Sequence, residues 1–258
     1  MNTTLPPPPS GATSLNLRSE RTGQPLAARV VRCPQPALGC VVLLHGLASN
    51  RTRWSELMET TTLGARWHLL APDLRGHGES QPAGKSTLED WCDDLAELLK
   101  AVEASGLGRI VLVGHSLGAQ VALHFVEHHP QRVASLVLID PVFRTALAPR
   151  WARIARAAPL FRVAAAAVRG LNAAGLRRAR VGPDDLRALD TLAREALRDP
   201  ASEAAFVHRY SSTRADLRQF RTAQYLQDLV EMFRPTPALD RICTGTDLIP
   251  VPTSWVPA

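Results

Sequence analysis

The sequence predicts an α/β fold with a mostly parallel central sheet and helices on both faces. Short runs of β-branched residues and leucine, typical of strands buried on both faces, alternate with segments whose apolar residues recur at helical spacing. A glycine-flanked serine stands where one such run meets a helical segment. Strands that alternate with helices in this way form parallel sheets with right-handed crossovers.

Residues 14–142 carry the strands and helices of this predicted core. Residues 14–20 and 26–31 alternate around a turn at Gly23, which predicts an antiparallel hairpin. Four apolar runs predict buried strands, at residues 40–44, 69–71, 110–113 and 136–139. Helices are expected over residues 88–102 and 117–129, and Pro130 ends the second of them.

The composition changes after residue 142. Residues 143–235 are rich in alanine, arginine and leucine and lack β-branched runs, so we expect an inserted helical cap or lid, with helices over 163–168, 186–197 and 217–230. Residues 1–13 contain four consecutive prolines and predict a disordered tail. Residues 236–258 are expected to be a remnant of the carboxyl-terminal part of the core.

Composition and charge limit the classes of partner. The chain has 258 residues, of which 45% are hydrophobic and 21% charged, as in an ordinary globular protein. Residues 143–234 hold 17 arginines against nine acidic residues, which predicts a solvated helical face, with steering of anionic substrates as the alternative. No nucleic-acid-binding module and no bilayer-spanning apolar run is recognisable. We therefore expect a small-molecule substrate, no nucleic acid and no membrane, and the oligomeric state stays open.

The cysteines and the amino terminus indicate a cytoplasmic protein. The four cysteines show neither metal-site spacing nor a dense disulfide pattern, so reduced thiols are expected. The first residues lack the basic and apolar regions of a signal peptide. No metal or organic cofactor is expected.

The candidate nucleophile is Ser116, in the G-x-S-x-G sequence of residues 114–118. A serine in a strained turn between a strand and a helix exposes its hydroxyl, and Gly114 and Gly118 let the two elements approach closely. The following helix directs its amino-terminal amides, first that of Leu117, at a developing oxyanion.

A second oxyanion donor is expected after the first buried strand. His45 and Gly46 end that strand, which places the backbone N–H of Leu47 for this role. We interpret His45, Gly46 and His115 as residues that shape the backbone near the site.

Four motifs together resemble the α/β-hydrolase superfamily, and the resemblance covers roughly residues 14–234. They are VLLHG at 42–46, DLRGHGES at 73–80, GHSLG at 114–118 and LIDP at 138–141, in the order and spacing of that family. The likeness is greatest to its capped esterases, epoxide hydrolases and C–C hydrolases. Serine at the elbow disfavours epoxide-hydrolase and dehalogenase chemistry, because those members use aspartate there. The resemblance implies hydrolysis of carboxylic ester or related acyl bonds through an acyl-enzyme at Ser116, with His77 in a structural role.

The acid of the expected catalytic triad is Asp247, in a turn at residues 245–250 that resembles the family's acid turn. A rival alignment places residues 251–253 at the entry to the preceding strand, which would leave the acid missing. Asp140, directly after a predicted strand, is the alternative acid, and a cap before Pro141 is its simpler interpretation.

The catalytic histidine is not evident, because no histidine follows Asp247. Three hypotheses stay open: a truncated or frame-shifted hydrolase, which we favour; a family member that lost catalysis and binds a ligand or partner; or substitution by another histidine. His208 could reach down from the cap, whereas His124, His128 and His129 lie mostly a turn or more beyond the elbow. Loss of the last strands would leave the strand ending at Ile139 as an apolar sheet edge.

Overall fold

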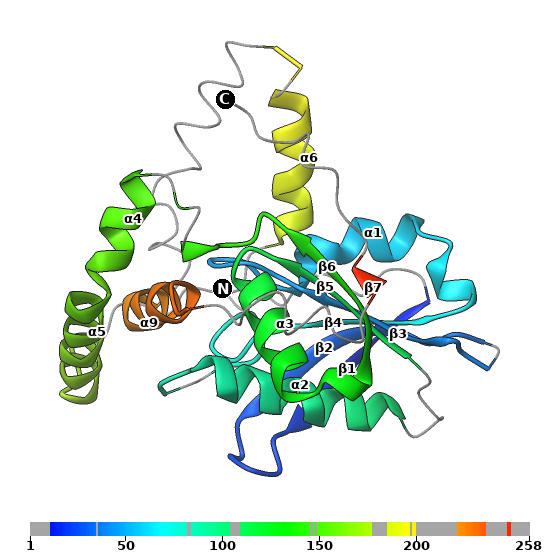
Figure 1. Cartoon of the computed structure of the whole chain (residues 1–258), viewed down its shortest axis with the longest axis horizontal. Helices are drawn as coiled ribbons and strands as arrows, with labels where there is room; N and C mark the ends of the chain where they lie inside the picture. Colours follow the sequence, from blue (N-terminus) through cyan, green and yellow to red (C-terminus); the bar gives the residue numbers. More distant parts are fainter. Residues whose placement is uncertain are drawn as a thin grey trace.

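The computed structural model of the chain contains one seven-stranded sheet, with strand order β1-β2-β4-β3-β5-β6-β7 (Figure 1). The first two pairs, β1 with β2 and β2 with β4, are antiparallel, and all other pairs are parallel. The strands are β1 (Ala12–Arg18), β2 (Pro25–Val31), β3 (Gly39–Leu44), β4 (His68–Pro72), β5 (Arg109–His115), β6 (Val133–Ile139) and β7 (Asp247–Leu248). The predicted α/β fold class is therefore confirmed.

The structure describes residues 11–34, 36–81, 84–103, 109–144, 147, 149–176, 185–196, 198–199, 221–235 and 247–248. Within these ranges the helices are α1 (Ser55–Thr60), α2 (Leu88–Glu103), α3 (Leu117–His128), α4 (Pro149–Arg156), α5 (Ala158–Ala173), α6 (Leu186–Ala196) and α9 (Thr222–Met232). Three short 3-10 turns are η1 (Arg51–Trp54), η2 (Leu63–Ala65) and η3 (Pro130–Arg132). None of the described helices is long and apolar enough to cross a membrane.

The predicted hairpin is present, and it begins two residues earlier than expected. Ala12 pairs with Val31 and is buried, and the Thr13 hydroxyl donates to the carbonyl of Val30 at 3.4 Å. Pairing with β2 thus includes Ala12 and Thr13 in the strand. The prediction of a tail over residues 1–13, which rested on the proline run, is therefore wrong for these two residues. Residues 1–10 of that tail lie outside the described residues.

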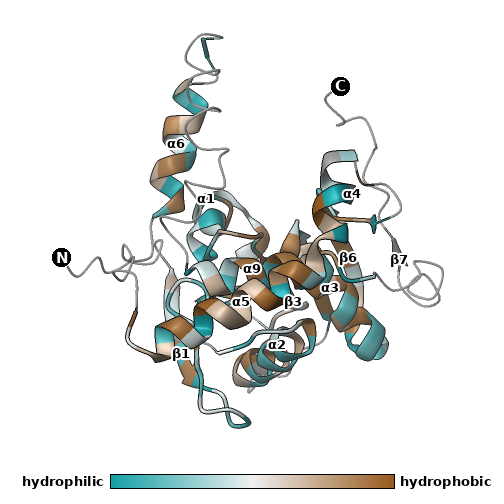
Figure 2. Cartoon of the chain, turned by 90° about the vertical axis from the view of Figure 1, so that its left-hand side faces the viewer, coloured by the Kyte–Doolittle hydropathy of each residue, from teal (hydrophilic) through white to brown (hydrophobic). Residues whose placement is uncertain are grey.

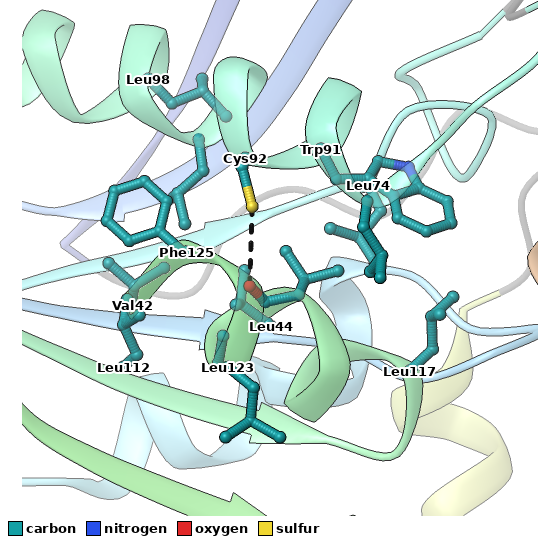
Figure 3. Packing of buried hydrophobic residues seen from close by; sticks show 14 of the residues in the cluster. Val42, Leu44, Leu74, Trp91, Cys92, Leu98, Leu112, Leu117, Leu123 and Phe125 are labelled. Atoms are coloured by element: carbon teal, nitrogen blue, oxygen red, sulfur yellow. Dashed lines mark hydrogen bonds between the residues drawn. The ribbon is translucent and has the colours of Figure 1, made fainter. Parts of the chain in front are cut away.

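The alternation of side chains along β3 separates two hydrophobic cores. Val42 and Leu44 face one side of the sheet, where α2 and α3 pack, as the close view in Figure 3 shows. Val41 and Leu43 face the other side and pack with Trp54 and other residues near α1. Because both faces are covered, the strand is apolar throughout, as predicted for a central parallel strand.

The core holds a buried thiol rather than a disulfide. The Sγ of Cys92 on α2 lies 3.7 Å from the carbonyl oxygen of Val121 on α3, which joins the two helices (Figure 3). Burial raises the pKa of Cys92 above its ordinary range. Cys33, Cys40 and Cys92 form no disulfide with one another, and Cys243 lies outside the described residues.

The described parts of residues 143–235 are helical, and they are held to the core in two different ways. Helix α9 packs beside α5 and contributes Tyr225, Leu229 and Met232 to the main core. Helix α6 instead projects from the body of the molecule (Figures 1 and 2), and ion pairs join it to η1 and α1. These pairs are Arg53–Asp190, Arg187–Glu59 and Arg194–Glu56. The assignment of 143–235 as a cap stays a prediction.

The outer edge of β6 is covered only in part by the described residues. Strand β7 pairs with Ser135 and Leu136, near the amino end of β6. Ile139, at the opposite end, is 41% exposed. The expectation that this strand forms the sheet edge is therefore wrong for its amino end, which β7 covers, while Ile139 at its carboxyl end is exposed.

Candidate active site

Ser116 forms a tight turn between β5 and α3. Its backbone has φ 50° and ψ −111°, a conformation that a residue with a side chain rarely adopts. Its N–H donates to the carbonyl of Ile139 at the end of β6, at 2.9 Å, which anchors the turn to the neighbouring strand. Strain of this kind persists only where the surroundings impose it, and it is common at active sites.

The two flanking glycines are required by close backbone contacts. A Cβ at Gly114 would lie 2.5 Å from the carbonyl oxygen of Gly118, the second residue of α3. A Cβ at Gly118 would lie 2.7 Å from the carbonyl oxygen of His45 and still closer to that of Leu44. The glycines therefore let α3 cross directly over the ends of β3 and β5, as the sequence motif predicted.

The loop after β3 lies against the elbow, where an oxyanion site requires it. The Cβ position of Gly46 is 3.3 Å from the Cβ of Ser116 and 2.8 Å from Nδ1 of His115. Leu47 follows directly, and Leu117 begins α3, so its N–H has no carbonyl partner within the helix. The structure thus brings the two predicted amide-bearing residues to the region of Ser116.

His45 holds the backbone of this loop as a neutral, fully buried imidazole. Its Nε2 accepts the N–H of Leu74 at 3.0 Å, so Nδ1 carries the proton and donates to the carbonyl of Gly46 at 2.9 Å. Burial lowers the pKa of His45 to about 4. The ring therefore serves the positioning role that the sequence analysis assigned to it.

The low pKa of His45 predicts a pH-dependent stability. Imidazoles of the unfolded chain bind protons below about pH 6.5, whereas folded His45 stays neutral to about pH 4. Its contribution is fully present above pH 6.5 and is lost as the pH falls toward 4. As the pH falls from 7.5 to 5.0, we expect the contribution of His45 to the free energy of unfolding to decrease by about 2 kcal/mol. Urea unfolding at both pH values gives the change in unfolding free energy for the wild type and for His45→Gln. The difference between these two changes is the contribution of His45. Equal pH dependence in the two proteins would contradict the assignment.

A buried ion pair between Arg51 and Asp73 stabilises the backbone next to His45. The carboxylate of Asp73 accepts the N–H groups of Arg51 and Glu79, both at 2.8 Å, and pairs with the guanidinium of Arg51. Arg51 is 2% exposed and also contacts Oε2 of Glu79 at 2.6 Å. Asp73 directly precedes Leu74, whose N–H donates to His45, so the ion pair fixes the backbone that holds the loop after β3.

His77 lies in a second buried polar cluster, between the 73–80 loop and α9. Its ring is 5.0 Å from that of His45, and its Nε2 is 3.3 Å from Oδ2 of Asp228. Burial lowers the pKa of His77 to about 3 and raises that of Asp228 well above its ordinary value. Asp228 also accepts the side-chain amide of Gln224 at 2.6 Å. These contacts dock α9 on the core, which agrees with a structural role for His77.

The side chain next to the Ser116 hydroxyl comes from α9. The Oγ of Ser116 lies 3.9 Å from the Sδ of Met232, and no hydrogen bond between Ser116 and an imidazole occurs among the described residues. His124, His128 and His129 lie toward the far end of α3, and His208 lies outside the described residues. Among the described residues, no histidine therefore lies where it could accept the Ser116 proton through a direct hydrogen bond.

The two candidate acids occupy different ends of the sheet. Asp140 is exposed and follows Ile139 at the end of β6, with φ 48°. Burial of the ring lowers the pKa of His115, and the negative charge of Asp140 offsets only part of this lowering. Asp247 lies in β7, where it pairs with Ser135, four residues or about 13 Å along the strand from Ile139. The described backbone thus does not bring Asp247 to the elbow, and its catalytic role stays a prediction.

The geometry of the elbow agrees with a match to known proteins. The family model described as "alpha/beta hydrolase fold" matches residues 39–234. The chain belongs to the alpha/beta hydrolase fold family. The matched range includes the elbow, the loop after β3 and α9.

Some curated relatives of the chain carry hydrolase names. Over 101 residues it is 38% identical to lipase LipV of Mycobacterium tuberculosis, a match that covers 39% of this chain and 36% of the relative. Over 112 residues it is 35% identical to the putative carbamate hydrolase RutD of Klebsiella pneumoniae, covering 43% and 41%. The chain thus spans less than half the length of these curated relatives. A thermophilic esterase from Thermogutta terrifontis has a similar structure, with a TM-score of 0.53, 25% identity and coverage of 87% and 74%.

Sequence reasoning missed three contributors to the site: Arg51, Met232 and Asp228. Arg51 lies 22 residues before its partner Asp73, and spacing alone does not reveal that contact. Met232 and Asp228 belong to a helix that the sequence assigned to a cap. Polar residues at Gln224 and Asp228, one turn apart within an apolar helical pattern, were the available signal that α9 buries a polar contact.

Proposed function

We propose that this chain is a serine hydrolase that acts on carboxylic esters or related acyl bonds through an acyl-enzyme at Ser116. The observation that carries the proposal is the strained elbow, in which Ser116 adopts φ 50° between a buried strand and a helix amino terminus. The names of the relatives, a lipase and a carbamate hydrolase, support an acyl carbon as the point of attack.

The proposed reaction has two steps. The Ser116 oxygen forms a bond to the acyl carbon, and the N–H groups of Leu47 and Leu117 bind the oxyanion that develops. The bond to the leaving alcohol then breaks, and the alcohol takes up the proton that the serine has lost. Water attacks the acyl-enzyme in the second step, which releases the acid and restores the hydroxyl.

The proton of Ser116 needs an acceptor, because a serine hydroxyl is a weak nucleophile until a base removes that proton. In the family this base is a histidine oriented by an acid. None of the described histidines is hydrogen-bonded to Ser116. We therefore assign the nucleophile and the oxyanion donors, and we leave the general base without a residue.

A second candidate function is ligand binding without turnover. It is favoured by one observation, the position of Met232 beside the Ser116 hydroxyl where a base would be expected. In this case the protein would bind a ligand without cleaving it, and the elbow would be a structural remnant of its family.

Hydrolysis of a p-nitrophenyl ester of a short-chain acid distinguishes the two candidates. We expect turnover that Ser116→Ala abolishes and that Ser14→Ala, a change at an exposed serine on β1, leaves unaltered. Circular dichroism establishes that each variant is folded. Turnover that persists in Ser116→Ala would refute the proposal, and a folded wild type without turnover would favour the binding protein.

A further inference from the structure

A separate cluster of metal-binding side chains lies on α3, away from the elbow. His124, Glu127 and His128 each offer a ligand atom, and these atoms lie within 4.8 Å of one another. The three residues share one face of the helix because they are spaced three and four apart. His124 stands eight residues, or about 12 Å, beyond Ser116 along the helix axis. The cluster is thus distinct from the candidate active site.

Both imidazoles are held in an orientation that suits metal binding. Nδ1 of His128 lies 2.8 Å from the carbonyl oxygen of His124, and donation to this oxygen leaves Nε2 of His128 with a free lone pair. Nε2 of His124 lies 3.4 Å from Oε1 of Glu89 on α2, while its Nδ1 lies 3.9 Å from Oε2 of Glu127. Metal-binding histidines typically present their second ring nitrogen to a carbonyl or a carboxylate in this way.

Two carboxylates lie beside the imidazoles of the cluster. Glu89 on α2, whose Oε1 faces Nε2 of His124, is held in place by Arg234, just beyond α9, at 2.6 Å and 2.8 Å. Glu127 supplies a second carboxylate on the exposed side.

We propose that His124, Glu127 and His128 bind one divalent transition-metal ion of the Zn²⁺ class, with water completing the coordination. Two imidazoles and one carboxylate suit Zn²⁺, whereas Mg²⁺ and Ca²⁺ prefer oxygen ligands throughout. Bonds of about 2.1 Å require the ligand atoms to come within about 3.4 Å of one another. Glu127 is exposed, so a change of its rotamer contributes to this approach. The bound ion would fix the end of the helix that begins at the candidate nucleophile.

Calorimetric titration with ZnCl₂ tests the proposal. The full chain, without a histidine tag and after removal of metal by chelation, is expected to bind one ion per molecule. His128→Ala is expected to weaken this binding at least tenfold, and Glu127→Gln to weaken it less. Co²⁺ gives a second readout, because coordination by these ligands produces visible absorption that His128→Ala removes.

His129→Ala is the matched control. This neighbouring residue lies outside the cluster, and its ring stacks 4.6 Å from that of Phe125. The variant is expected to bind Zn²⁺ like the wild type. Undiminished Zn²⁺ affinity in the double variant His124→Ala/His128→Ala, or absence of saturable binding in the wild type, would overturn the proposal.

Discussion

Substitution of Gly118 by alanine is expected to lower the free energy of unfolding by at least about 3 kcal/mol. The added Cβ would lie 2.7 Å from the carbonyl oxygen of His45 and closer still to that of Leu44. Both atoms belong to the backbone at the end of β3, so neither can turn aside as a flexible side chain does. Relief of the overlap requires α3 to move away from the sheet, and this movement would also displace the elbow at Ser116. Urea unfolding followed by circular dichroism measures the loss.

Gly170→Ala is a control for this prediction. Gly170 lies in α5 and has open space around its Cβ position. Alanine there is expected to stabilise the protein by about 0.5–1 kcal/mol, because alanine favours a helix over glycine. If Gly118→Ala were as stable as Gly170→Ala, the close approach of α3 to β3 could not be correct.

Removal of the Asp73 carboxylate by Asp73→Ala is expected to cost about 3–5 kcal/mol of unfolding free energy. Three groups lose their acceptor: the guanidinium of Arg51 and the N–H groups of Arg51 and Glu79. Arg51 is 2% exposed, so water cannot replace the lost partner, and only the contact with Glu79 at 2.6 Å remains. Removing one partner of a buried ion pair costs much more free energy than the intact pair contributes to stability. Chemical denaturation measures the change.

The matched comparison is Asp93→Ala on α2. The Asp93 carboxylate is 51% exposed and lies 3.1 Å from Nε of Arg21, which is itself 47% exposed. Such surface pairs contribute at most about 1 kcal/mol, so this variant is expected to unfold nearly like the wild type. Similar losses in both variants would show that burial does not set the strength of the Asp73 pair.

The local patterns of the sequence predicted the core of this fold well. Continuous apolar runs predicted β3, β4, β5 and β6. Both faces of such a strand are buried, so nearly all of its residues are apolar and the run is easy to recognise. Gly114 and Gly118 predicted a close approach of helix and strand, and the structure places backbone oxygens where a Cβ at either glycine would lie. The elbow and the position of the loop after β3 could likewise be predicted, since both are short segments at strand ends.

Contacts between distant segments could not be predicted in the same way. The pairing of Arg51 with Asp73 and the position of Met232 beside Ser116 depend on how the chain crosses over, not on local spacing. Asp247 was selected from a turn pattern, whereas the structure places its backbone in β7 beside Ser135. A two-residue strand carries too short a pattern for its position in the sheet to be inferred from sequence.

The reactivity of Ser116 toward a fluorophosphonate probe tests the central claim most directly. Such probes form a covalent bond to an activated serine oxygen. Mass spectrometry of the peptides is expected to locate one adduct on Ser116 in the wild type, and Ser116→Ala is expected to remain unlabelled while Ser14→Ala reacts normally. Two results would contradict the assignment of Ser116 as the nucleophile. The folded wild type could acquire no adduct, or the Ser116→Ala variant could be labelled as strongly as the wild type.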